Sequence, residues 1–169
     1  MDLHDTLKSQ YEAALRMLDD AIEKCPEQLW IDSSVRNPFW RLAYHTLFYT
    51  HLYLSSSEAT FVLWEKSRPN LQFMGKLPWP PHDTIDPGEP YTRSELRQYL
   101  GVLRSQLGDL LSKSELDGPA GFDWIPFSRM ELMLYNLRHL QHHGGQLADR
   151  IAVATGQGVV WVGYGSDSE

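Results

Sequence analysis

Hydrophobic residues recur every three or four positions along four long stretches of the chain, which is the spacing of one face of a helix. The stretches cover about residues 3–24, 37–57, 92–112 and 128–155. The first ends at Cys25-Pro26, because proline disfavours the helical conformation of the residue before it. Its apolar positions form a single stripe: Leu3, Leu7, Tyr11, Leu15, Leu18 and Ile22.

Capping residues mark where these helices begin and end. Asn37 is a good N-cap for the second helix, with Pro38 at the first helical position. Thr92-Arg-Ser-Glu95 and Ser128-Arg-Met-Glu131 both match the capping box, in which two side chains satisfy free amides reciprocally. Gly156 is a suitable stop for the fourth helix.

Four amphipathic helices in 169 residues predict an all-α four-helix bundle, formed by a single domain over residues 1–169. A helical domain with an added β-hairpin is the alternative, but the body of the chain has no strand pattern. The connection over residues 66–91 is long and rich in proline and apolar residues. We expect either a functional loop packed on the bundle or a surface Ω-loop. The tail, 156–169, includes the apolar Val159–Val162.

The second helix is apolar nearly all round, so it is either central in the bundle or covered by a partner. Together with Val159–Val162, this apolar surface predicts a symmetric homodimer, since large exposed apolar patches are uncommon on monomers.

Composition limits which cellular compartments and which kinds of partner are expected for this chain. The formal charge of −7 argues against a general affinity for nucleic acid or anionic membranes. The single cysteine, Cys25, excludes a disulfide framework and a cysteine-based zinc site within one chain, and it fits a reducing cytoplasm. No signal peptide is apparent, and the most apolar stretch, 39–54, is too short and too often interrupted by polar residues to cross a membrane. We therefore expect a soluble cytoplasmic protein.

Histidines supply the candidate chemistry. His139 and His143 are four positions apart and lie side by side on a helix, a spacing that metal sites use, although solvated helix faces also carry such pairs. At about 100° per residue, His142 points to solvent, while His139 and His143 flank the buried arc. The adjacent Gly144-Gly145 would let another helix or a ligand approach closely.

A third ligand is expected from the second helix. His45 lies in an apolar stripe, where an unpaired imidazole is costly, so it needs a hydrogen bond or a metal. His51 falls on a different side, and we prefer His45. Three neutral imidazoles leave a coordination position open, which is typical of a catalytic site. Zn²⁺ and Ni²⁺ both accept imidazole, and either would make a bound water or thiol nucleophilic.

Other candidate residues are fewer. Tyr49 and Asn136 each lie one turn from a candidate ligand and are possible helpers, and the catalytic residues are otherwise unassigned. No Ser-His-Asp or Cys-His arrangement is evident in the sequence. We expect the 66–91 loop to roof part of the cleft, with Trp79 or Met74 near its entrance.

The helix Trp40-Arg-Leu-Ala-Tyr-His45, followed by His139-x-x-x-His143-x-Gly145-Gln146, resembles the DinB/YfiT-like superfamily. The resemblance extends from the first helix to the fourth, although family members often have arginine at the position of Gly144. It implies an up-down-down-up bundle, frequent homodimers, and a three-histidine metal site whose ligand positions match His45, His139 and His143.

Characterised members of this family include S-transferases that use mycothiol or bacillithiol and a mycothiol-dependent maleylpyruvate isomerase. The sequence therefore favours a metal-dependent thiol S-transferase or hydrolase with zinc or nickel, a small-molecule substrate and a low-molecular-weight thiol. A non-catalytic metal-binding stress or sensor protein is the first alternative. A structural bundle whose histidines bond one another is the second.

Overall fold

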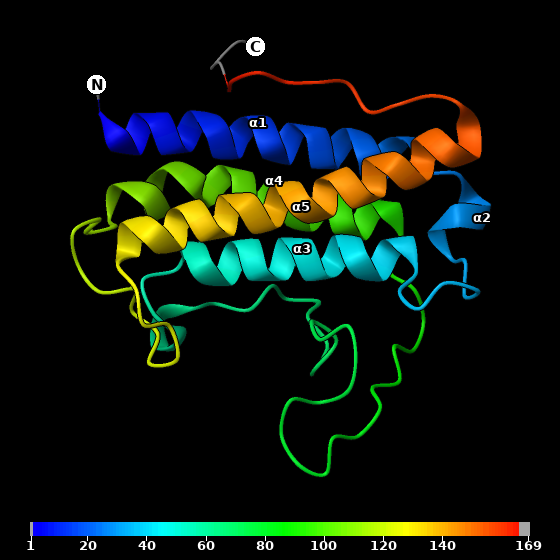
Figure 1. The fold of residues 1–169 in the computed structure, drawn as a ribbon, viewed down its shortest axis with the longest axis horizontal. Coiled ribbons are helices and arrows are strands. Elements are labelled where there is room, and N and C mark those ends of the chain that lie inside the picture. Colours follow the sequence, from blue (N-terminus) through cyan, green and yellow to red (C-terminus); the bar gives the residue numbers. More distant parts are fainter. Residues whose placement is uncertain (1, 166–169) are drawn as a thin grey trace.

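The computed structural model describes residues 2–165, and four long helices dominate this part of the chain (Figure 1). No strand occurs among these residues, so the prediction of an all-α bundle is confirmed. That the whole chain forms one domain stays a prediction. The long helices are α1 (Leu3–Lys24), α3 (Phe39–Leu54), α4 (Arg93–Ser112) and α5 (Arg129–Thr155), and the short ones are α2 (Glu27–Trp30) and the 3₁₀ helix η1 (Glu58–Thr60).

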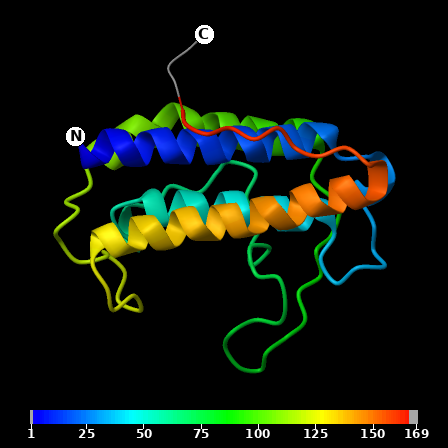
Figure 2. The same ribbon diagram turned by 45° about the horizontal axis from the view of Figure 1, so that its top comes forward.

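The bundle has the expected up-down-down-up order. Followed by colour in Figure 1, α1 and α5 run in one direction and α3 and α4 in the other, and Figure 2 agrees. Helix α1 packs on α4 and α5, and α3 packs on the same two helices. Because α3 and α4 are parallel, the connection between them must return the chain along the whole bundle, which explains its length.

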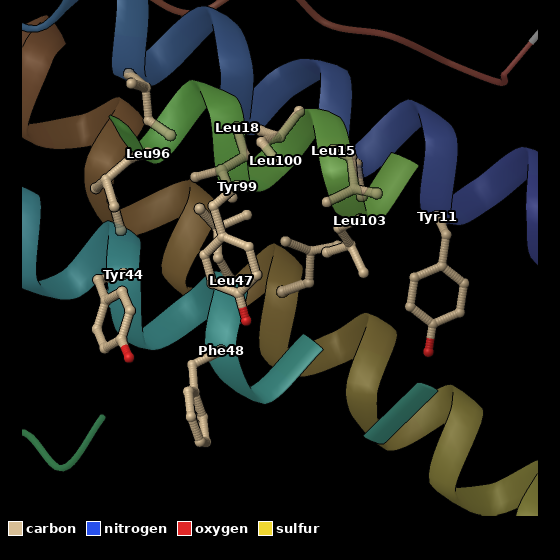
Figure 3. Close-up of a cluster of buried hydrophobic side chains, with 14 of the residues drawn as sticks. Tyr11, Leu15, Leu18, Tyr44, Leu47, Phe48, Leu96, Tyr99, Leu100 and Leu103 are labelled. Carbon is tan, nitrogen blue, oxygen red and sulfur yellow. The ribbon is translucent and has the colours of Figure 1, made fainter. Parts of the chain in front are cut away.

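Leucines fill the space between the helices. Leu15 and Leu18 from α1 meet Leu47 from α3 and Leu100 and Leu103 from α4 (Figure 3), and each is at most 2% exposed. Burying a leucine contributes roughly 1.5–3 kcal/mol. The stripe predicted for α1 is buried as expected except at its first position, where Leu3 in the first turn is 52% exposed.

The capping predictions hold in part. Thr92 and Glu95 form the complete capping box, whereas Ser128 caps the Glu131 amide without the reciprocal bond. The predicted N-cap at Asn37 is wrong by one residue. Pro38 occupies that position, and its carbonyl accepts from the Arg41 and Leu42 amides.

The end of α3 also differs from the prediction, because the helix stops at Leu54 rather than near residue 57. Ser55 is extended, with φ −66° and ψ 150°. The carbonyls of Leu54 and Ser55 accept hydrogen bonds from the guanidinium of Arg129, at 2.7 and 2.8 Å. This buried cation caps α3 where the pattern of apolar residues would allow the helix to continue. At the other boundary, Gly156 ends α5 in the left-handed conformation at φ 72°, as expected.

The chain's own loops cover much of the apolar surface of α3. Tyr91 packs its ring against Tyr44, with 5.0 Å between centroids, and Phe61 packs on Phe48 with 5.4 Å between centroids. The surplus apolar surface of α3 therefore does not itself require a partner subunit. The same contacts show that the residues after η1 pack on the bundle.

The tail runs along α1 (Figure 2). The Val160 amide donates to Asp20 Oδ2 and the Gly165 amide to the Ser9 carbonyl, both at 2.9 Å. Residues 166–169 of the predicted tail lie outside the described residues. None of the described helices combines the length and the apolar character that a membrane crossing requires.

The homodimer stays a prediction, and the exposed apolar tail now motivates it, because Val160 and Trp161 are 61% and 75% exposed. Light scattering at micromolar concentration should report twice the chain mass. The double variant Val160→Ser/Trp161→Ser should shift the mass toward that of one chain. Val62→Ser, at an equally exposed site, is the control. A wild-type chain that scatters as a monomer would contradict the prediction.

Candidate metal centre

Three histidines from two helices meet where α3 packs on α5. His45 belongs to α3, and His139 and His143 belong to successive turns of α5. Their ring centroids are 4.5–5.1 Å apart, and one ligand atom from each lies within 4.8 Å of the other two. The structure thus brings together the three residues that the sequence singled out.

Hydrogen bonds fix the protonation of two of these rings. His45 Nδ1 lies 2.6 Å from the Gln72 carbonyl, which can only accept, so Nδ1 carries the proton and Nε2 is bare. Likewise, His143 Nδ1 donates to Gln146 Oε1 at 2.8 Å. Such bonds to the far nitrogen are how proteins orient imidazole ligands. Both rings therefore keep a free Nε2 lone pair for a metal.

His139 completes the group. Its Nε2 lies 3.1 Å from Nε2 of His45, while its Nδ1 is buried without a hydrogen-bond partner. Hydrogen bonding of the histidines to one another therefore does not satisfy the cluster. A metal–nitrogen distance of about 2.0–2.1 Å is compatible with nitrogens this close, so the donor set fits a divalent cation.

Burial keeps the imidazoles neutral. It lowers the pKa of His45 to about 4, against an opposing effect of the Gln72 hydrogen bond. It lowers the pKa of His139 to about 3, with the neighbouring imidazoles adding to the shift, and it lowers the pKa of His143 as well. Metal ligands must be deprotonated. Protons therefore do not compete for these nitrogens near neutral pH.

His142 and His51, which the sequence analysis excluded as ligands, lie outside the three-histidine group. His142 is exposed on the outer face of α5. His51 is 4% exposed, and its Nδ1 lies 3.2 Å from the Tyr99 hydroxyl, inside the bundle. Both positions agree with the helix geometry used in the sequence analysis.

Of the two possible helpers, Tyr49 lies at the cluster. Its ring centroid is 4.8 Å from that of His45 and 5.8 Å from that of His139. Burial raises the pKa of Tyr49 to about 12, so its hydroxyl remains a hydrogen-bond donor at neutral pH. Asn136 is completely buried and donates to the Thr50 carbonyl at 3.1 Å, so it serves the packing of α3 on α5.

Within the described chain, no other helix makes the close approach expected at Gly144 and Gly145, and the approach of a ligand there stays a prediction. Apart from the adjacent residues and the backbone of α5 itself, no described atom lies within 4 Å of a side-chain carbon built at either position. The two glycines are therefore not needed to let another helix of this chain pack closely against α5.

A cavity of about 710 Å³ lies beside the histidines, and Tyr49 and Gln72 belong to its lining. These two residues also contact His45, so the cavity and the histidine group share a wall. Trp79 lines the cavity as expected, whereas Met74 packs against the core.

Sequence reasoning missed two orienting residues. Gln146 stands three positions after His143 on one helix, a spacing that could have suggested the contact. Gln72 contacts His45 across 27 residues of chain through its backbone carbonyl, for which the sequence carries no signal.

An up-down-down-up bundle with three histidines between two of its helices defines a class of helical proteins with a candidate metal centre. The family model described as DinB superfamily matches residues 10–147, which is most of the chain. The chain therefore belongs to the DinB superfamily. No curated protein and no solved structure matches it.

Proposed function

We propose that this protein is a metal-dependent enzyme in which His45, His139 and His143 hold a divalent cation, zinc or nickel. This metal site would activate a low-molecular-weight thiol or a water, which then attacks a small-molecule substrate, as in a thiol S-transferase or a hydrolase. One observation carries the proposal: three neutral imidazoles converge beside a cavity of about 710 Å³. Three protein ligands leave a coordination position for the reacting group.

A cation held by His45, His139 and His143 would lower the pKa of a water or thiol in its open position and so supply a nucleophile near neutral pH. The chain's own groups hold and orient the site. The Gln72 carbonyl and the Gln146 side chain fix the tautomers of His45 and His143. The ring of Tyr49 packs on His45 and lines the cavity, so we expect its hydroxyl to donate a hydrogen bond to a group bound there.

Family membership supports thiol chemistry, because characterised relatives use mycothiol or bacillithiol. A non-catalytic metal-binding protein is the alternative, and a water-activating hydrolase is the other enzymatic form. A cytoplasmic location also belongs to the proposal. It is supported by the single cysteine, Cys25, which is a buried free thiol as expected in a reducing compartment.

The thiol hypothesis is testable by titrating cobalt-substituted protein with mycothiol, bacillithiol and glutathione. We expect one of them to produce a thiolate-to-cobalt absorption band and to release about one proton per chain, because metal binding deprotonates a thiol. Calorimetry in buffers of different ionisation enthalpy counts that proton. The S-methylated form of the same thiol is the control and should give neither signal. No heat and no spectral change with any thiol would count against the transferase and favour the hydrolase or the non-catalytic protein.

A further inference from the structure

The cavity beside the histidines has walls from four parts of the chain. Helix α3 contributes one wall, η1 and the residues after it a second, the long connection a third, and the α4–α5 connection the fourth. Phe48 points from α3 away from α1 and α4 (Figure 3). Three residues of α3, namely His45, Tyr49 and Tyr53, are partly exposed, whereas the rest of the helix is buried. They are spaced by four and form one stripe, which leads from the candidate metal centre into the cavity.

The lining is unusually aromatic, since seven of its twelve residues carry aromatic rings. Several rings meet edge to face, which fixes their orientation. Phe73 and Trp79 are 5.5 Å apart at 86°, and Phe48 and Phe61 are 5.4 Å apart at 80°. The faces of aromatic rings carry the negative part of the ring quadrupole, and they attract cations.

Charge in the lining has one sign. Glu58 in η1 is the only charged residue among the described lining residues, and no ion pair within the described part of the chain includes it. A carboxylate without a protein cation beside it, at the edge of an aromatic cavity, favours a positively charged ligand.

The rim of the cavity leaves large apolar side chains in water. Leu63, Trp79 and Trp124 are 58%, 49% and 54% exposed. Single exposed apolar residues are ordinary, but a group of them around one cavity is typical of a ligand site. The volume falls within the range of about 300–1,000 Å³ that is usual for small-molecule sites.

We propose that this cavity binds an apolar organic cation, an amine or quaternary ammonium on an aromatic or aliphatic body. The aromatic faces hold the cation and its body, and Glu58 supplies the counter-charge. That this ligand is the substrate of the enzyme rests on the proposed function, because Tyr49 and Gln72 place the cavity beside His45. The binding itself requires only the cavity.

Three probes of similar shape and different charge test the inference: phenyltrimethylammonium, tert-butylbenzene and benzenesulfonate. Their binding is followed by the tryptophan fluorescence of the metal-free and the metal-loaded full chain. We expect the cation to bind about tenfold tighter than the neutral probe, and the anion to bind most weakly. Glu58→Gln should reduce the preference for the cation several-fold while binding of the neutral probe persists, which shows that the cavity is intact.

Glu89→Gln makes the same chemical change in the long connection outside the cavity, and it should leave the preference unchanged. Trp79→Leu should weaken binding of the cation more than binding of the neutral probe. Equal affinities for the cation and its neutral isostere, or a preference that survives Glu58→Gln, would overturn the inference. Because the measurement includes metal-free protein, a chain that binds the cation but no metal would refute the proposed function alone. A chain that binds metal without preferring the cation would refute this inference alone.

Discussion

Replacing His143 with alanine is expected to abolish stoichiometric binding of zinc or nickel, and His142→Ala is expected to leave it intact. The two residues are neighbours in sequence, but only His143 turns its ring into the group with His45 and His139. Two imidazoles without a third form a weak site in which water must supply the remaining ligands. Elemental analysis of dialysed, untagged protein measures the metal content, and competition with a chromophoric chelator measures the affinity.

A variant with an expected effect between those of His142→Ala and His143→Ala makes the test more specific. Gln146→Leu keeps all three imidazoles but removes the acceptor of the His143 Nδ1 proton. The loss of such an orienting partner typically weakens metal binding about 10–100-fold. We therefore expect the affinity to fall in the order wild type and His142→Ala, then Gln146→Leu, then His143→Ala. Far-UV circular dichroism should confirm that each variant is folded. Equal losses in His142→Ala and His143→Ala would show that the wrong face of α5 was chosen.

The helices were predictable because their signals are local. The apolar stripe of α1 and the cap of α4 at Thr92 depend on residues within a few positions of one another. The choice of His45 over His51 also required only the angular position of each residue on one helix. All three candidate ligands could be inferred in this way, because His139 and His143 also share one helix face.

The features that escaped prediction depend on contacts between distant residues. The end of α3 at Leu54 is set by Arg129, 75 positions later, and Gln72 meets His45 only after the long connection folds back on α3. The cavity is a stronger case, because Glu58 and Trp124 lie far apart in the sequence and nothing in their immediate neighbours indicates a shared wall. A single sequence records the preferences of each segment, but not which loop covers which helix.

Arg129 illustrates how much such a contact contributes to the fold. Its side chain is 3% exposed and has no carboxylate partner among the described residues. It donates instead to three carbonyls and one hydroxyl, those of Leu54, Ser55, Ala120 and Ser114. The Leu54 and Ser55 carbonyls belong to the C-terminal end of α3, which carries partial negative charge. One cation thus joins the end of α3, the α4–α5 connection and the start of α5.

Arg129→Met is therefore expected to lower the free energy of unfolding by about 3–5 kcal/mol, because methionine fills the space but leaves these buried acceptors unpaired. Arg129→Lys should rescue little of the loss, since an ammonium cannot reach four acceptors in the guanidinium's planar arrangement. Arg97→Met is the matched control. Arg97 forms an exposed ion pair with Asp19, which is worth about 0–1 kcal/mol. Urea denaturation of the three variants and the wild type measures these differences. If Arg129→Met and Arg97→Met were equally stable, the guanidinium would be a replaceable filler, and the early end of α3 at Leu54 would need another cause.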